Sequence, residues 1–381
     1  MKKLITVVGA RPQIIKSSAI SRAIGNKFSK EIQEVIVHTG QHYDDNMSKI
    51  FFDELGIPNP DYNLNVGSGS HGAQTAKMLE GLESIFLKEK PDGVIVYGDT
   101  NSTIAGALAA VKIHIPVIHV EAGLRSFNKS MPEEINRIAC DHMSTLLFTP
   151  TVTGMDNLAR EGVSLLPEGK ASVDNPQIHH CGDVMYDNSL YFSKHSEMQS
   201  TIIQELKLEA NNYILGTVHR DMNTDDPQRM ESIFTALINL AEEFEMKFVL
   251  PLHPRTKGKM ESNLSEELRL RLIKSMHVVI IPPAGFLDIL TLEKHAKLLI
   301  TDSGGLQKEA YFFKKPCVIL REQTEWVEIV SNGNAILADA DYNRVEDAFR
   351  TLIKKDDFTY PSYYGEGNAA EFICQKIIEQ I

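Results

Sequence analysis

The fold is first indicated by residues 4–16, LITVVGARPQIIK, where an apolar run leads directly into a glycine and then into two cations. Residues 4–8 have the length and composition of a buried parallel strand, and Gly9 permits a tight turn from that strand into a helix. Arg11 and Lys16 follow near the start of the helix, where unpaired backbone N–H groups favour an anion. The pattern predicts an anion-binding turn, although a plain turn with two solvated cations fits it too. GxGxxG is absent, so no dinucleotide-binding fingerprint can be claimed.

Both halves of the chain repeat this alternation of apolar strand and amphipathic helix. In the first half, strands are predicted at residues 4–8, 34–38, 93–97, 117–120 and 146–148, with helices at 14–24, 74–88 and 103–112. In the second half, strands are predicted at residues 213–217, 247–251, 278–281, 297–301 and 317–320, with helices at 227–244 and 306–313.

Repeated βαβ units form doubly wound parallel sheets, and 381 residues exceed what one hydrophobic core normally organises. We therefore predict an α/β protein of two Rossmann-like, doubly wound domains, with a boundary between residues 170 and 195. Residues 161–178, rich in Gly, Pro, Ser and Asn, are predicted as surface loop. Open α/β sheets bind ligands at the carboxyl ends of their strands, so we expect the two domains to face a central cleft.

Composition excludes several classes of protein. The chain is 43% hydrophobic and 24% charged, and its net charge of −12 has the wrong sign for nucleic acid or anionic lipid. No apolar stretch approaches the roughly 18 residues of a membrane span. The four cysteines form no CxxC pair, and the cluster His179, His180, Cys181 and Asp183 lacks metal-ligand spacing. We expect a cytoplasmic protein without a nucleic-acid partner, a membrane partner or a metal site.

Acidic residues follow the third and fourth predicted strands of the first half. YGDTNST places Asp99 after residues 93–97, and HVEAGLRS places Glu121 after residues 117–120. Two carboxylates in one pocket can divide acid and base roles, although Asp99 as a helix N-cap and Glu121 as a partner of Arg125 fit equally well. MPEEINR, residues 131–137, adds Glu133 and its neighbour at a helix start, where the helix dipole also favours carboxylates.

Histidine and arginine follow the strands of the second half. TVHRDMN places His219 and Arg220 after residues 213–217, and PLHPR places His253 after residues 247–251. Histidine suits proton transfer near neutral pH and arginine suits phosphate, although a lone loop histidine is more often a structural hydrogen-bonding group.

The segment TDSGGLQKEA, residues 301–310, is the strongest local indication of a ligand-binding site. It joins a predicted strand to a helix, so the N–H groups of Ser303, Gly304 and Gly305 can face a diphosphate. Glu309 lies about one helical turn further on, where it could accept hydrogen bonds from ribose hydroxyls or be an exposed helix charge. LREQTEW places Arg321 close to the same pocket.

The motifs GARPQIIK, TGQHYDDNM, YGDTNST, HVEAGLRS, MPEEINR, TVHR, DSGG and LREQTE occur in this order. With them the sequence resembles, over nearly its whole length, the non-hydrolysing UDP-N-acetylglucosamine 2-epimerases of bacteria and archaea. The resemblance implies a glycosyltransferase B-like architecture with domains at residues 1–185 plus 366–381 and at residues 186–365, the last helix returning to the first domain. It also implies a homodimer.

The resemblance further implies a reaction that needs no cofactor. UDP leaves a UDP-amino sugar by elimination across C1 and C2, giving a 2-acetamidoglucal, and adds back after protonation of the opposite face of C2. Matching motifs assign Asp99, Glu121, Glu133 and His219 to catalysis, without deciding which carboxylate is the base. Binding of UDP or the sugar is implied for Arg11, Lys16, Gln41, His42, Arg125, Arg220, His253, Phe286, Ser303, Gly304, Gly305, Glu309 and Arg321.

Departures from the family pattern concern the sugar end of the substrate. Tyr43, Asp44 and Asp45 follow GQH, and Trp326 follows TE where arginine is frequent. These variants resemble the 2-epimerases of UDP-2,3-diacetamido-2,3-dideoxyglucuronate, which is the alternative substrate. A UDP-sugar glycosyltransferase and a non-catalytic UDP-sugar sensor rank lower, because the YGDT, VEAGLR and PEE motifs are all present.

Overall fold

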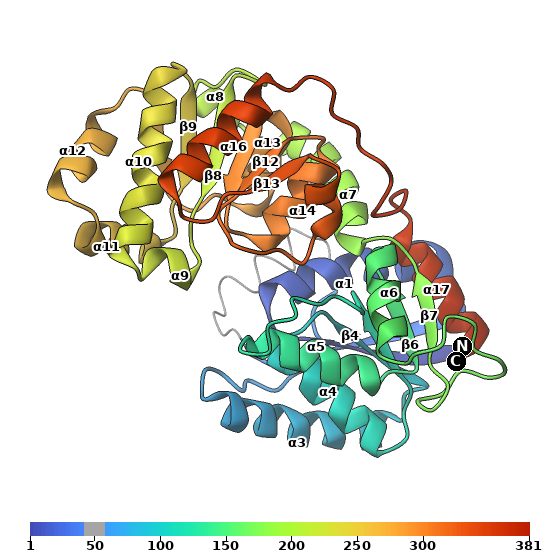
Figure 1. The fold of residues 1–381 in the computed structure, drawn as a ribbon. Helices are drawn as coiled ribbons and strands as arrows, with labels where there is room; N and C mark the ends of the chain where they lie inside the picture. Colours follow the sequence, from blue (N-terminus) through green and yellow to red (C-terminus); the bar gives the residue numbers. More distant parts are fainter. Residues whose placement is uncertain (42–57) are drawn as a thin grey trace. The chain divides into compact units, whose positions relative to one another are not determined.

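The structure, a computed structural model, describes residues 1–41 and 58–381 (Figure 1). The chain divides into two compact units. Residues Met1–Asn188 and Ser362–Ile381 form unit 1, and residues Ser189–Pro361 form unit 2. Each unit is built around one β-sheet, in which every strand pair is parallel.

Runs of aliphatic and β-branched residues form the seven-stranded sheet of unit 1, in the order β3-β2-β1-β4-β5-β6-β7. Its strands are β1 (Lys2–Val8), β2 (Ile32–His38), β3 (Tyr62–Asn63), β4 (Gly93–Tyr97), β5 (Val117–Val120), β6 (Leu146–Thr149) and β7 (Gln177–His180). Every residue of β4, β5 and β6 is buried, as expected for parallel strands that helices cover on both faces.

Two layers of helices cover this sheet. Helices α3, α4 and α5 pack side by side, and α1 packs against the C-terminal helix α17 in the other layer (Figure 1). The helices are α1 (Arg11–Ala23) with the π-helical turn η1 (Ile24–Phe28), α3 (His71–Glu89), α4 (Asn101–Lys112), α5 (Pro132–His142), α6 (Val152–Arg160) and α17 (Ala369–Gln380). Helix α7 (Val184–Gln199) carries the chain from unit 1 into unit 2.

Unit 2 repeats the architecture with a six-stranded sheet in the order β10-β9-β8-β11-β12-β13. Its strands are β8 (Tyr213–Thr217), β9 (Lys247–Pro251), β10 (Val278–Ile281), β11 (Leu298–Thr301), β12 (Cys317–Ile319) and β13 (Ala335–Leu337). Its helices are α8 (Ile202–Glu205), α9 (Asp221–Thr224), α10 (Pro227–Glu243), α11 (Pro254–Asn263), α12 (Glu266–Lys274), α13 (Phe286–His295), α14 (Gly304–Phe312), α15 (Val327–Ser331) and α16 (Tyr342–Lys354).

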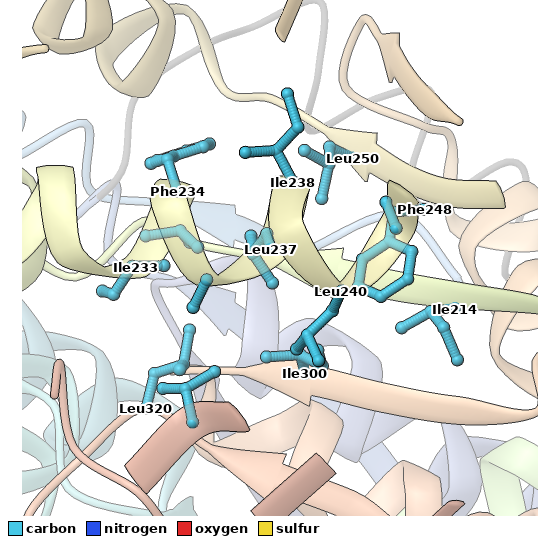
Figure 2. Packing of buried hydrophobic residues seen from close by; sticks show 14 of the residues in the cluster. Ile214, Ile233, Phe234, Leu237, Ile238, Leu240, Phe248, Leu250, Ile300 and Leu320 are labelled. Carbon is cyan, nitrogen blue, oxygen red and sulfur yellow. The ribbon is translucent and has the colours of Figure 1, made fainter. Parts of the chain in front are cut away.

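The core of unit 2 lies between its sheet and helix α10. Figure 2 shows Phe234, Leu237 and Ile238 of α10 packed over strand residues such as Phe248 and Ile300, all of them fully buried. Burial of this apolar stripe stabilises α10 more than its intrinsic helix propensity does. The core therefore fixes the sheet whose strand ends carry the candidate site residues.

Both sheets reverse their strand order next to their first strand. In unit 1 the reversal lies between β1 and β4, and in unit 2 between β8 and β11. In doubly wound sheets this switch point, at the carboxyl ends of the strands, is where ligands bind. The turns after β1 and β4, and those after β8 and β11, are therefore the places to look for function.

The predicted α/β fold of two Rossmann-like, doubly wound sheets is confirmed. Every predicted strand is present, and β4, β5, β8, β9 and β10 have the predicted bounds. The short strands β3 and β13 were missed, and the predicted loop at residues 161–178 is wrong at its end, where β7 begins. Among residues 1–41 and 58–381, no helix combines the length and the apolar character needed to cross a membrane.

Candidate active site

The turn after β1 is held against the end of β4 by one buried side chain, Gln13. Its Oε1 accepts hydrogen bonds from Gly9 N at 2.9 Å and Ala10 N at 3.2 Å, and its Nε2 donates to Tyr97 O at 2.9 Å. A Cβ at Gly9 would lie 2.1 Å from Ser102 Oγ, so no other residue fits there without displacing its neighbours. Gln13 was not among the predicted site residues, because only the fold brings its amide to the end of β4.

Lys16 and Glu121 form an ion pair at the switch point of unit 1. Both side chains are mostly buried, and both charged groups lie 3.2 Å from where a Cβ of Gly98 would be. Glu121 has a φ of +73°, a left-handed conformation that costs a non-glycine residue free energy. The alternative that Glu121 pairs with Arg125 is wrong, since the partner is Lys16.

Asp99 follows β4 and pairs with Arg137 of α5. Its side chain is 28% exposed, and its backbone carbonyl accepts a hydrogen bond from Asn136 Nδ2 at 2.9 Å. Thr100, not Asp99, is the N-cap of α4, so the N-cap alternative for Asp99 is wrong. The carboxylates of Asp99 and Glu121 thus each have a cationic partner at the ends of neighbouring strands.

The two glutamates at the start of α5 have different environments. Glu134 is buried and accepts hydrogen bonds from Ser126 N and Phe127 N, both at 2.9 Å. Glu133 is partly exposed and makes no hydrogen bond or ion pair with any residue that the structure describes. Of the two, Glu133 is therefore the one available for proton transfer.

Arg125 belongs to a buried charge network rather than to an open surface. Its guanidinium contacts Asp141 at 2.7 Å and makes a two-point contact with Glu161 at 2.7 and 2.6 Å. Burial alone lowers the pKa of Arg125, but the hydrogen bonds and charges of Glu161 and Asp141 raise it above its usual value. This environment favours a structural role over the predicted contact with substrate.

The other predicted residues of unit 1 lie near the same strand ends. Arg11 is exposed in the first turn of α1. Gln41 accepts hydrogen bonds through Oε1 from Ser102 N at 3.0 Å and Ser102 Oγ at 2.7 Å, which places it beside the start of α4. His42 lies outside the described residues.

In unit 2, the buried carboxylate of Asp302 organises the turn after β8. It accepts hydrogen bonds from His219 N, Arg220 N and Asn223 Nδ2, all between 3.0 and 3.1 Å. His219 Nδ1 lies 3.2 Å from Asp302 Oδ1, while the imidazole is 46% exposed. A carboxylate that orients a partly exposed imidazole is the arrangement of a proton-transfer group.

The start of α14 has the features of an anion-binding site. Ser303 is its N-cap, and Gly304 and Gly305 supply the first helical N–H groups. A Cβ at Gly304 would lie 3.7 Å from the Arg321 guanidinium, so this cation is close to the helix start. Glu309 is only 8% exposed, so the alternative that it is an exposed helix charge is wrong.

Three further predicted residues lie on neighbouring loops of unit 2. Arg220 caps α9, and its Nε is buried without a hydrogen-bond partner among the described residues. His253 is exposed and caps α11 by accepting a hydrogen bond from Arg255 N at 3.3 Å. Phe286 begins α13 and packs edge-on against Phe192 with ring centroids 5.2 Å apart.

Sequence reasoning missed Asp302, although its position directly after an apolar strand could have singled it out. It also missed Lys308, which is buried and lies 4.1 Å from the ring centroid of Trp326. Within residues 1–41 and 58–381, no group of three or more His, Cys, Asp or Glu side chains could hold a metal ion.

Comparison with known proteins places this geometry in a family. Residues 26–378 match the sequence model of a family described as UDP-N-acetylglucosamine 2-epimerase. The chain belongs to this family. One relative is a UDP-N-acetylglucosamine 2-epimerase homolog of Methanococcus maripaludis, which is 48% identical. Another is a UDP-2,3-diacetamido-2,3-dideoxy-D-glucuronate 2-epimerase of Pseudomonas aeruginosa, which is 47% identical. Each match covers 98% of this chain and 98% of the relative.

Solved structures agree with this family membership. The UDP-GlcNAc 2-epimerase of Methanocaldococcus jannaschii, crystallised in complex with UDP-GlcNAc and UDP, is 40% identical, covers 99% of both chains and has a TM-score of 0.85. A plant UGT2 from Phytolacca americana is only 10% identical but has a TM-score of 0.60, covering 99% of this chain and 94% of its own. The latter match concerns the fold alone, and it agrees with the predicted glycosyltransferase B-like architecture.

Proposed function

We propose that the chain interconverts UDP-N-acetylglucosamine and UDP-N-acetylmannosamine without hydrolysing them. A base removes the C2 proton as the bond from C1 to the UDP oxygen breaks, which leaves a C1–C2 double bond and free UDP. An acid then protonates the opposite face of C2, and the diphosphate oxygen of UDP adds back to C1. The reaction balances without an oxidant, a reductant or water.

The observation that carries this proposal is the pair of carboxylates, Asp99 and Glu121, after neighbouring strands of unit 1, each with its own cation. Each cation holds its carboxylate in place at the strand end, as proton transfer to a fixed position requires. Glu133, partly exposed and unpaired among the described residues, suits the complementary role of acid.

Unit 2 would hold UDP. The N–H groups at the start of α14 and the nearby Arg321 suit the diphosphate, and Glu309 would accept hydrogen bonds from the ribose. His219, oriented by Asp302, would serve in proton transfer or in stabilising the leaving diphosphate. Lys16, Arg11 and the other predicted binding residues, Arg125 excepted, stay assigned to UDP or the sugar as predictions.

Proton NMR of the purified protein with UDP-N-acetylglucosamine in deuterated water tests the proposal. We expect the manno epimer to form, with deuterium replacing the C2 proton in both sugars. Glu121→Gln should lower the rate by about 1,000-fold, since it removes a base or acid of the reaction. Glu89→Gln is the matched control, because Glu89 is also an ion-paired carboxylate of unit 1 but its partner, Lys3, lies in β1 near the start of that strand.

Release of free N-acetylmannosamine and UDP would contradict the non-hydrolysing reaction. No turnover of UDP-N-acetylglucosamine would point to the alternative substrate, UDP-2,3-diacetamido-2,3-dideoxyglucuronate. That alternative is supported by the 47% identity to the Pseudomonas aeruginosa enzyme and by the buried Lys308 and Trp326 close to the α14 start. Comparing kcat/KM for the two sugars in parallel assays decides between them.

We further propose that the protein is a cytoplasmic homodimer. Light scattering coupled to size-exclusion chromatography tests the oligomeric state, and a mass near 42.6 kDa, that of one chain, would contradict it.

A further inference from the structure

His119 of β5 is a fully buried histidine whose two ring nitrogens both contact acceptors. Nδ1 lies 2.7 Å from Asp141 Oδ1, and Nε2 lies 2.8 Å from the carbonyl oxygen of Gly98. A carbonyl oxygen can only accept, and so can an ionised carboxylate. If Asp141 is ionised, both ring nitrogens must carry protons, and the ring is an imidazolium.

Asp141 of α5 is surrounded by groups that favour its ionised form. Besides His119, it accepts a hydrogen bond from Gly123 N at 3.1 Å and contacts the Arg125 guanidinium at 2.7 Å. Burial alone raises its pKa, but His119 and Arg125 outweigh burial and lower it below the usual value. Arg125 in turn contacts Glu161, so two cations and two anions balance within the network.

The network holds the backbone on both sides of the candidate catalytic carboxylates. Gly98, whose carbonyl accepts from His119, directly precedes Asp99, and Gly123, whose N–H donates to Asp141, lies two residues after Glu121. Gly98 also lies next to the Lys16–Glu121 pair, close to both charged groups. One buried pair thus links the turn after β4 to the turn after β5.

We propose that the His119–Asp141 pair is a positioning device for the reaction, in which a charged imidazolium fixes the turns that carry Asp99 and Glu121. The device rests on the proposed epimerase function. Neither residue touches substrate, since both are fully buried. Glu121 needs such support because its left-handed backbone conformation costs free energy that the surrounding contacts must offset.

The test replaces the imidazolium by a neutral side chain of similar reach, His119→Gln. We expect kcat to fall by about 100-fold, because a misplacement of about 1 Å is enough for such a loss. KM should change by less than about threefold, since the loss concerns the transition state rather than substrate binding. The dissociation constant for UDP should change little, because the residues proposed to hold the diphosphate and the ribose, at the start of α14 with Glu309 and Arg321, lie in unit 2.

His179→Gln is the matched control. His179 is a partly buried histidine of the same sheet, in β7, and its Nε2 lies 2.9 Å from Gln380 Oε1 of the C-terminal helix. We expect this variant to keep the wild-type kcat. An unchanged kcat in His119→Gln, or an equal loss of kcat in both variants, would overturn the positioning role.

A second measurement needs no variant. In wild-type protein labelled with ¹⁵N-histidine, the His119 ring should show two protonated nitrogens at pH 8, where an ordinary histidine is neutral. A neutral His119 ring would overturn the proposal even if His119→Gln failed to fold. Wild-type protein that turns over neither UDP-sugar would instead refute the proposed function, so the two failures are distinguishable.

Discussion

Asp141 in unit 1 and Glu293 in unit 2 are both fully buried acids, and the structure treats them in opposite ways. Asp141 contacts a histidine, an arginine and a backbone N–H group. Neither carboxylate oxygen of Glu293, on α13, has a hydrogen-bond partner among the described residues. Burial, and then the charge of Glu309, raise the pKa of Glu293 well above its usual value, so Glu293 keeps its proton.

The difference shows that burial alone does not determine what an acid contributes to stability. An ionised acid that is surrounded by donors and cations stabilises the fold, and its removal takes a buried anion away from those cations. A protonated acid without partners still costs free energy of desolvation, so an apolar side chain at its position would make the fold more stable. The two acids should therefore respond oppositely to the same substitution.

Asp141→Leu should give the largest effect. The variant leaves His119 and Arg125 buried without their shared anion, so we expect unit 1 to lose about 4 kcal/mol of stability. Hydrogen exchange of the β4 and β5 amides, followed by mass spectrometry, reports the stability of this unit separately. Asp156→Leu is the control, because Asp156 is an exposed acid for which no partner is found among the described residues. Asp61→Leu would not serve, because Asp61 accepts a hydrogen bond from Ile36 N at 2.8 Å.

Glu293→Leu should give the next effect, with the opposite sign. We expect unit 2 to gain about 3 kcal/mol at pH 8, because an apolar side chain removes the desolvation cost of an unpaired acid. Urea unfolding followed by tryptophan fluorescence measures this directly, because Trp326 is the only tryptophan in the chain and lies buried in unit 2.

The pH dependence sharpens the result for Glu293. Its pKa is raised in the fold, so its contribution to stability is greatest below the unfolded value near 4.5 and is lost as pH rises towards the folded pKa. The gain from Glu293→Leu should therefore be smaller at pH 4.5 than at pH 8. A loss of stability at pH 8 would mean that Glu293 contributes a contact that this structure does not account for.

The strands and the switch points could be predicted from the sequence, because buried parallel strands are continuous apolar runs and the catalytic candidates directly follow them. The strand at residues 93–97 predicted the position of Asp99, and the predicted helix start after residues 297–301 that of Ser303. The hydrogen-bond and ion-pair partners of these residues could not be predicted in this way. Arg125 resembled a substrate-binding cation by its motif, and only the packing of α5 against β5 shows Asp141 beside it.

For the same reason the residues alone left open which of Glu133 and Glu134 acts, and only the family resemblance assigned Glu133 to catalysis. Both lie in the first turn of α5, but successive helix residues point in different directions. Glu134 is therefore buried and accepts a hydrogen bond from Ser126 N, whereas Glu133 is partly exposed. The sequence did not single out Glu293, since a buried acid without partners has no signature in a single sequence. Local patterns therefore predicted elements and positions, whereas the pairing of charges depended on the tertiary structure.

Asp187 should show the smallest effect, because it is intermediate between the two acids. It accepts hydrogen bonds from Ala369 N at 3.1 Å and Ala370 N at 2.8 Å, which cap α17, yet burial outweighs them and raises its pKa from 3.8 to about 6. A raised acid pKa gives stability that is fully present below pH 3.8 and is lost as pH rises through about 6. Because the side chain is partly exposed, we expect this loss to amount to about 1 kcal/mol.

Asp187→Asn removes the titration but keeps an oxygen that can cap α17. From pH 4 to pH 7 the wild type should therefore lose about 1 kcal/mol of unfolding free energy relative to the variant. Hydrogen exchange of the α17 amides at the two pH values, corrected for intrinsic exchange rates, measures this difference. A variant whose advantage does not change with pH would show that the two N–H bonds keep Asp187 ionised throughout, which would place it with Asp141 rather than with Glu293.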